Sequence, residues 1–179
     1  MQINTALSAL DNLLALINAA NTGQTITDTQ VTAGTPAEQT ADGQGRNTNV
    51  AINAVAGQGY TGTQTVTYAR RPLNDSVVSP DFAVTETIGA TAASIITALA
   101  ATNGLVASEL ELQDPANGNA VVTGAISNSP ATLNLVSITG SLLYIDASSQ
   151  AVTFTWQEPQ VALTTAIATT ALTGFDAAS

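Results

Sequence analysis

The feature that most constrains this fold is a pattern that occurs twice, a short amphipathic segment followed by segments of alternating polarity. In its first occurrence, apolar residues recur at spacings of three and four: Leu7, Leu10, Leu14 and Ile17. This spacing predicts a helix over residues 5–20, and Ile95 and Leu99 share one face of a second predicted helix over 91–101. Because helices this short are seldom stable alone, we expect an α+β protein in which each helix packs on an antiparallel sheet.

Segments of alternating apolar and polar residues predict the strands of those sheets. In the first half we expect a short strand at 25–32, a loop at 35–45, and a hairpin of 48–55 with 63–69. In the second half we expect strands at 82–87, 106–112, 121–126 and 133–138, then a hairpin of 142–145 with 151–156. Val152, Phe154 and Trp156 alternate with polar residues and therefore share one face of the last strand.

The chain divides at a break in this pattern, which Pro72 and Pro80 bracket. We expect a helix-plus-hairpin subdomain at 1–72, a linker at 73–80, a helix-plus-sheet subdomain at 81–159 and an extended C-terminal arm at 160–179. The segments 13–21 and 95–104 both end a helix, and each half then closes with a strand that carries an aromatic residue. This similarity indicates two similar units that arose by duplication, and a chance match of two α+β units is the alternative.

The C-terminal arm has an unusual composition, because residues 160–179 carry a single charge, Asp176. Its large apolar residues fit neither a helical nor a strand period: Val161, Leu163, Ile167, Leu172 and Phe175. Disordered tails normally carry more charge and fewer apolar residues. We therefore interpret the arm as a segment that docks, for example onto a neighbouring subunit, with a frayed terminus as the alternative.

The residue types that are missing exclude several chemistries. The 179 residues include no His, Cys or Lys and only three Arg, and the net charge is −10. This excludes His-based triads, cysteine nucleophiles, zinc fingers and the Walker A lysine, together with a basic footprint for nucleic acid. No stretch has the composition of a membrane span or a signal peptide, so we expect a cytosolic chain without cofactor or metal.

The scarcity of charge also predicts the character of the surface. Only 9% of residues are charged, against roughly 25% in a typical soluble domain. Ala and Thr together make up 60 of the 179 residues. The surface must therefore be covered by neutral hydrogen-bonding groups, which suits packing against copies of the same chain, and a secreted Thr-rich domain is the alternative.

Carboxylates are the groups that remain for acid–base catalysis. Glu109 and Glu111 are two residues apart, which places them on one face of the predicted strand. Such a pair could serve a glycosidase, but two surface acids on a polar strand face are the favoured interpretation. Asp42 and Asp114 open segments whose oxygens could bind calcium, and because neither has an EF-hand pattern we predict turns.

Three further residues are candidates for contacts. Arg70 and Arg71 end a predicted strand in an acidic chain, so we expect them to pair with carboxylates, either inside the chain or between subunits. The loop at 57–62 resembles a phosphate loop only in its glycines, because it joins two strands and leads into no helix. Tyr60 in that loop could stack on a sugar, which makes this a candidate ligand loop.

Four segments of the first half carry a family resemblance. They are LALINAAN at 14–21, VTAGTP at 31–36, RNTNV at 46–50 and GQGYTGTQTVTYAR at 57–70. In order and spacing, residues 10–72 resemble a family of virion structural proteins of large tailed bacteriophages. The second half is similar to the continuation found in such proteins, though with less specific motifs.

The resemblance implies a non-enzymatic structural subunit, without catalytic residues, assembled in the host cytoplasm into the virion. Its expected partners are copies of itself, as a homo-oligomer, and other virion proteins. Head decoration, a tail or baseplate component and a fibre-like appendage are all open, and the charge of −10 disfavours contact with the packaged genome. A module that binds a host receptor or glycan is the alternative function, and a hydrolase using Glu109 and Glu111 is a more remote one.

Overall fold

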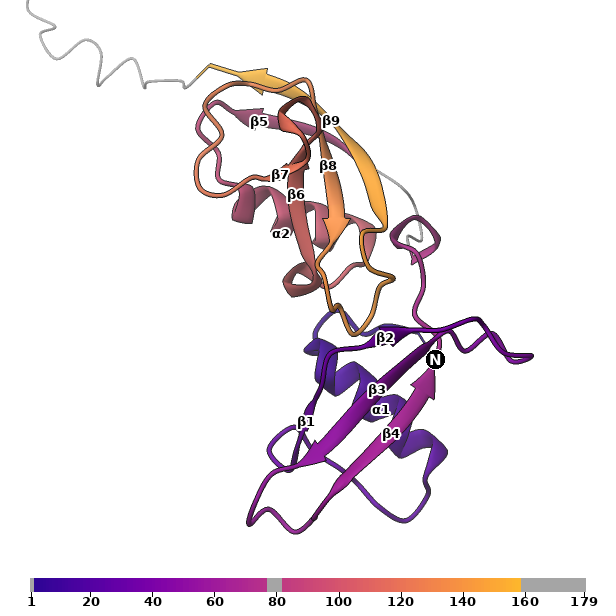
Figure 1. The fold of residues 1–179 in the computed structure, drawn as a ribbon. Helices are drawn as coiled ribbons and strands as arrows, with labels where there is room; N and C mark the ends of the chain where they lie inside the picture. Colours follow the sequence, from indigo (N-terminus) through magenta and orange to yellow (C-terminus); the bar gives the residue numbers. More distant parts are fainter. Residues whose placement is uncertain (1, 77–81, 159–179) are drawn as a thin grey trace, which may run out of the picture.

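The computed structural model describes residues 2–76 and 82–158, which form two units, each with a helix packed on a sheet (Figure 1). The first unit contains α1 (Ala9–Ala20), β1 (Val31–Ala33), β2 (Ala37–Glu38), β3 (Thr48–Ala54) and β4 (Thr63–Tyr68). The second contains β5 (Ala83–Thr87), α2 (Ala92–Asn103), β6 (Leu110–Asp114), β7 (Ala120–Val121), β8 (Thr132–Ser137) and β9 (Ser149–Gln157). The predicted α+β class is confirmed.

Helix α1 begins four residues later than predicted, because the side chain of Asn12 folds the preceding segment into a turn. Its amide donates to the carbonyl of Asn4 and its Oδ1 accepts from the Asn4 backbone N–H, at 2.9 and 2.7 Å. Ser8 is the N-cap, since its hydroxyl accepts from the backbone N–H of Asp11. The predicted start at residue 5 is therefore wrong, and because Leu7 precedes the helix, the apolar stripe is shorter than the spacing suggested.

The first sheet is built around β3. Strand β4 lines one edge with Val50 opposite Val66, as the predicted hairpin requires. The other edge carries β1 and β2 in succession, which amounts to one strand interrupted near Pro36. The strand expected at 25–32 therefore reduces to its last residues, and part of the loop expected at 35–45 is β2.

The core of the first unit lies between α1 and one face of this sheet. Six buried residues form it: Leu13, Leu14, Val31, Val50, Ile52 and Tyr68. The opposite face of the hairpin carries Thr and Asn side chains, because residues alternate between the two faces of a strand. This unit therefore has one apolar face covered by its helix and one polar face without a covering helix (Figure 1).

The second unit has a five-stranded sheet in the order β5-β9-β8-β6-β7, in which only the β5–β9 pair is parallel. Helix α2 is capped by Thr91 and ends at Gly104, whose φ of 68° is the left-handed conformation that favours glycine at this position. Ile95 and Leu99 pack from it into the core, as predicted. The sheets of the two units differ in strand order and direction, so the similarity between the halves extends to a 12-residue helix and an antiparallel closing pair.

Strand β9 closes the second core as its alternation predicts. Val152 and Phe154 are buried and Trp156 is half-buried on the same face. The rings of Phe154 and Trp156 stack at 5.1 Å, and the indole N–H donates to the carbonyl of Pro130 at 2.7 Å. The half-buried indole ring of Trp156 thus has a hydrogen-bond partner for its polar N–H group.

Three of the strands expected in the second unit are wrong in whole or in part. Residues 142–145 are a loop, because Tyr144 points its buried hydroxyl at the backbone N–H of Val106. The strand expected at 121–126 is only the two residues of β7, and residues 107–109 form a 3-10 turn before β6. Leu73, expected in the linker, has no exposed surface and belongs to the second core, while residues 77–81 lie outside the described part of the chain.

Candidate functional site

The two units meet around the side chain of Arg70, which directly follows β4 and has no exposed surface. Its Nε donates to the hydroxyl of Thr48 at 3.0 Å, within the first unit. Its Nη1 donates to the carbonyl of Ser141 and to the carboxylate of Asp146, both at 2.6 Å, in the second unit. Nη2 donates to Glu38 on β2 at 3.2 Å. The guanidinium therefore hydrogen-bonds to both units and holds them in contact.

The backbone of Arg70 is held as firmly as its side chain. Asn47 accepts from the backbone N–H of Arg70 and donates to its carbonyl, both at 2.8 Å. Of the two pairings open from the sequence, the internal one is therefore present. An assembly residue should be accessible to a neighbouring subunit. Arg70 is not, because only 2% of its surface is exposed.

A second ionisable group, Glu109, supports the same contact. Its Oε2 accepts from the hydroxyl of Ser141 at 2.6 Å and from the backbone N–H of Leu142 at 2.8 Å. Glu109 is only 7% exposed, since it lies in the 3-10 turn, where its side chain faces the 141–142 loop. The prediction of a solvated surface acid is therefore wrong for this residue.

The predicted carboxylate pair does not form on one strand face. Glu109 precedes β6, whereas Glu111 lies within it, is half-buried and accepts from the side chain of Gln113 at 2.8 Å. The two groups contact different partners, which removes the geometric premise of a glycosidase pair on one face. Glu109 is a structural acid that fixes the loop on which Arg70 acts.

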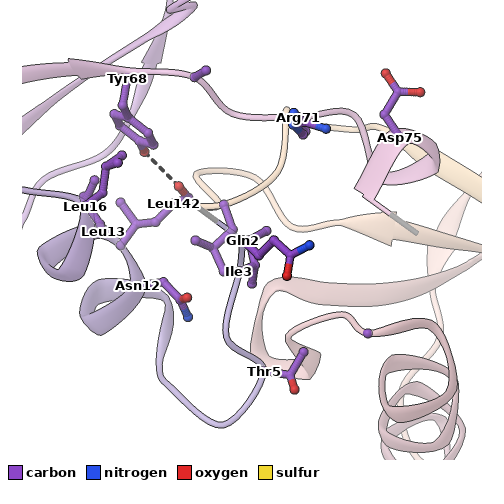
Figure 2. Close-up of a pocket in the computed structure, with 13 residues that line it drawn as sticks. Gln2, Ile3, Thr5, Asn12, Leu13, Leu16, Tyr68, Arg71, Asp75 and Leu142 are labelled. Carbon is purple, nitrogen blue, oxygen red and sulfur yellow. Dashed lines mark hydrogen bonds between the residues drawn. The ribbon is translucent and has the colours of Figure 1, made fainter. Parts of the chain in front are cut away.

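Two buried tyrosines complete the junction. The hydroxyl of Tyr68 donates to the carbonyl of Leu142 at 2.9 Å, which links β4 to the same loop (Figure 2). Burial raises the pKa of Tyr68 to about 12, and the nearby charge of Arg70 opposes that rise. Burial likewise raises the pKa of Tyr144. Both hydroxyls are therefore neutral at physiological pH and act as hydrogen-bonding groups.

A cavity of about 500 Å³ lies beside this junction, between the N-terminal segment, α1 and the 142–143 loop (Figure 2). Leu13 and Leu16 line one side of it, and Arg71 and Asp75 lie on the other. Leu16 is 37% exposed, so the cavity opens to solvent. Its size falls within the range of about 300–1,000 Å³ for ligand pockets. No sequence pattern predicted this cavity, because its walls come from segments that are distant in the chain.

Arg71 differs from its neighbour Arg70. Its backbone pairs with the 143–145 loop, but its side chain is exposed and makes no ion pair with the residues the structure describes. Arg46, by contrast, pairs with Asp42 at 2.7 Å. The side chain of Arg71 is therefore a cation at the cavity with no acidic partner in residues 2–76 and 82–158.

The other candidate residues occupy ordinary surroundings. Hydrogen bonds from Arg46 and Gln44 hold the pKa of Asp42 below its usual range, and a turn follows Asp42 as predicted. Asp114 ends β6 and accepts from the backbone N–H of Ala116, so it caps the 3-10 turn that follows it. Tyr60 is half-buried, and its hydroxyl lies 3.4 Å from the side-chain oxygen of Gln24. The described residues contain no group of three or more acidic side chains that could hold a metal ion.

The expected docking residues of the C-terminal arm lie outside the described residues: Val161, Leu163, Ile167, Leu172 and Phe175. None of the helices in the two described segments has the length and apolar character needed to cross a bilayer. No curated protein and no solved structure matches this chain. Residues 3–178, however, match a single protein family. The chain therefore belongs to DUF7941, a family of unknown function.

Proposed function

We propose that this chain is a non-enzymatic structural subunit of a tailed-phage virion, which assembles in the host cytoplasm through repeated contacts with copies of itself and with other virion proteins. The observation that carries the proposal is the free edge of β4, which pairs only with β3 among the strands of the described residues. A sheet edge presents unpaired backbone groups, and proteins normally protect it with charge, proline, a break or short length.

The other described edges carry such protection and β4 does not. The opposite edge of the first sheet is interrupted near Pro36 and bears Glu38. In the second sheet, β5 bears Glu86, and β7 has only two residues. Strand β4 is six residues long and consists of Thr, Gln, Val and Tyr, without charge or proline. It is therefore the edge best suited to receive a strand of another chain.

The register of the hairpin identifies the backbone groups available there. Ala54 donates to the carbonyl of Gly62, so alternate residues of β4 from Gly62 onward bond to β3. The backbone groups of Thr63, Thr65 and Thr67 therefore point to the free edge. Only the Thr65 carbonyl has a partner, the side-chain amide of Gln64 at 3.1 Å, which another strand could displace.

Beside this edge lies a polar face of the hairpin whose desolvation costs little free energy. The hydroxyls of Thr63 and Thr67 donate across the strands to Asn53 and Asn49, both at 2.8 Å. These side chains satisfy one another and carry no charge. Burying them against a neutral partner therefore avoids the desolvation penalty of ionised groups, which favours repeated contacts between subunits.

The test combines particle location with a charge placed on the edge. We expect the chain in purified phage particles, and a multimer by sedimentation of the purified protein. Thr65→Lys should raise the dissociation constant at least tenfold, because an edge lysine opposes strand pairing. Thr97→Lys, an exposed site on α2, adds the same charge away from the edge and should leave association unchanged. A monomer that is absent from particles would refute the proposal, and a monomer that binds host glycans would favour the receptor-binding alternative.

A further inference from the structure

We infer that the open cavity beside the unit junction receives the C-terminal arm, residues 160–179, of a second copy of this chain. The inference rests on the proposed assembly function and names the segment and the acceptor site of one contact. The surface of the cavity is unusual for this molecule. An apolar floor lies next to a cation that the described residues leave without an acidic partner.

The floor of the cavity is apolar and partly exposed. Leu13 and Leu16 of α1 line it together with Ile3 and the loop residues Leu142 and Leu143. Leu16 is one of only three large apolar residues exposed above about a third in the described part of the chain, at 37%. With the half-buried Ile3 and Leu142 it forms an apolar surface that is open to solvent and available to a partner.

The charge at the cavity identifies the complementary segment. Arg71 is exposed there without an ion pair, although the chain carries 13 acidic residues. Asp75 lies on the same side and forms no ion pair with it. The arm offers what the cavity lacks, because Leu172 and Phe175 are followed at once by Asp176, its only charge. Apolar anchors beside one carboxylate match an apolar floor beside the Arg71 guanidinium, with which the neighbouring Asp75 forms no ion pair.

Strand β9 carries the chain away from the cavity before the arm begins. Strand β9 starts next to the 138–148 loop at the junction and runs nine residues away from it to Gln157 (Figure 1). At about 3.3 Å per residue, its far end lies roughly 30 Å from the cavity side. We assign the cavity to the arm of a second copy because the proposed function requires contacts between copies, and the resulting contact joins two different surfaces, as in rings and filaments.

Cysteine cross-linking in the full chain tests the inference, because the natural chain contains no cysteine. Leu16→Cys is made in one isotope-labelled chain and Thr173→Cys in an unlabelled one. The two are mixed and treated with a short bismaleimide. We expect cross-links between labelled and unlabelled peptides, at least tenfold above those with Thr97→Cys replacing Leu16→Cys. If cross-links form only when both cysteines are in one chain, the arm docks on its own molecule and the inference is wrong.

A charge reversal provides a second readout that does not depend on cross-linking geometry. Arg71→Glu should weaken association at least tenfold, and adding Asp176→Arg to it should restore most of the loss. Failure of both the cross-link and the rescue overturns the inference. If the protein still enters particles and Thr65→Lys still weakens association, the proposed structural function stands while this contact is rejected.

Discussion

Arg70 and Asp146, which lie 76 positions apart in the chain, form an ion pair of 2.6 Å across the junction of the two units. The Arg70 side chain is fully buried, whereas that of Asp146 is 32% exposed. A buried guanidinium is tolerated only when its donors are satisfied, and here Thr48, Ser141, Asp146 and Glu38 accept from it. The pair is therefore the centre of a network in which each unit stabilises the other.

Replacing this arginine should strongly destabilise the fold. Arg70→Met removes the guanidinium that donates hydrogen bonds to the buried Thr48 hydroxyl and the buried Ser141 carbonyl. We expect the free energy of unfolding to fall by about 3 kcal/mol. Denaturant unfolding followed by circular dichroism and by the single tryptophan, Trp156, measures this loss. Arg46→Ala breaks the exposed pair with Asp42 and should leave the free energy of unfolding nearly unchanged. If the two variants lowered the free energy of unfolding equally, Arg70 would not be the residue that holds the two units together.

The buried carboxylate of Glu109 should matter far more than that of Glu111. Glu109→Ala leaves the Ser141 hydroxyl and the Leu142 N–H without their acceptor, and we expect a loss of about 2 kcal/mol. Glu111→Ala, which removes an acceptor for a half-buried Gln113 amide, serves as the matched control and should cost under about 1 kcal/mol. Equal stability of the two variants would show that Glu109 is not a structural acid.

Stability should fall at high pH through Tyr68. The folded-state pKa of about 12 lies above the usual 10, so the neutral form stabilises the fold fully below pH about 10 and this contribution disappears as pH rises through about 12. The difference corresponds to at most roughly 3 kcal/mol. Tyr68→Phe removes the titrating group, and its unfolding free energy should depend less on pH between 9 and 12. Identical pH profiles for the two proteins would contradict this assignment.

Packing of the second core should depend on Leu112, which has no exposed surface and lies in β6 facing α2. Leu112→Ala leaves a cavity in that core and should cost about 2–5 kcal/mol. Val121→Ala on β7, which is 50% exposed, should cost under about 1 kcal/mol. Thermal unfolding of both variants checks the contrast, and a large loss for Val121→Ala would mean that another surface covers it.

The helices and the principal hairpin could be predicted because their information is local. The spacing of Ile95 and Leu99 and the caps Thr91 and Gly104 bound α2 within two residues of the prediction. The start of α1 was missed because Asn12 bonds back to Asn4, an arrangement that competes with the helix and leaves no trace in apolar spacing.

The sequence by itself determined the α+β class, the two strands of the first hairpin and the absence of His, Cys and Lys chemistry. These properties follow from side-chain periods within a strand or helix and from residue types alone. The tertiary structure decided that Arg70 is buried while Arg71 is exposed at the cavity, and that Glu109 turns inward. Adjacent arginines are equivalent in the sequence, and they diverge because only the side chain of Arg70 lies within hydrogen-bond reach of groups more than 70 residues away.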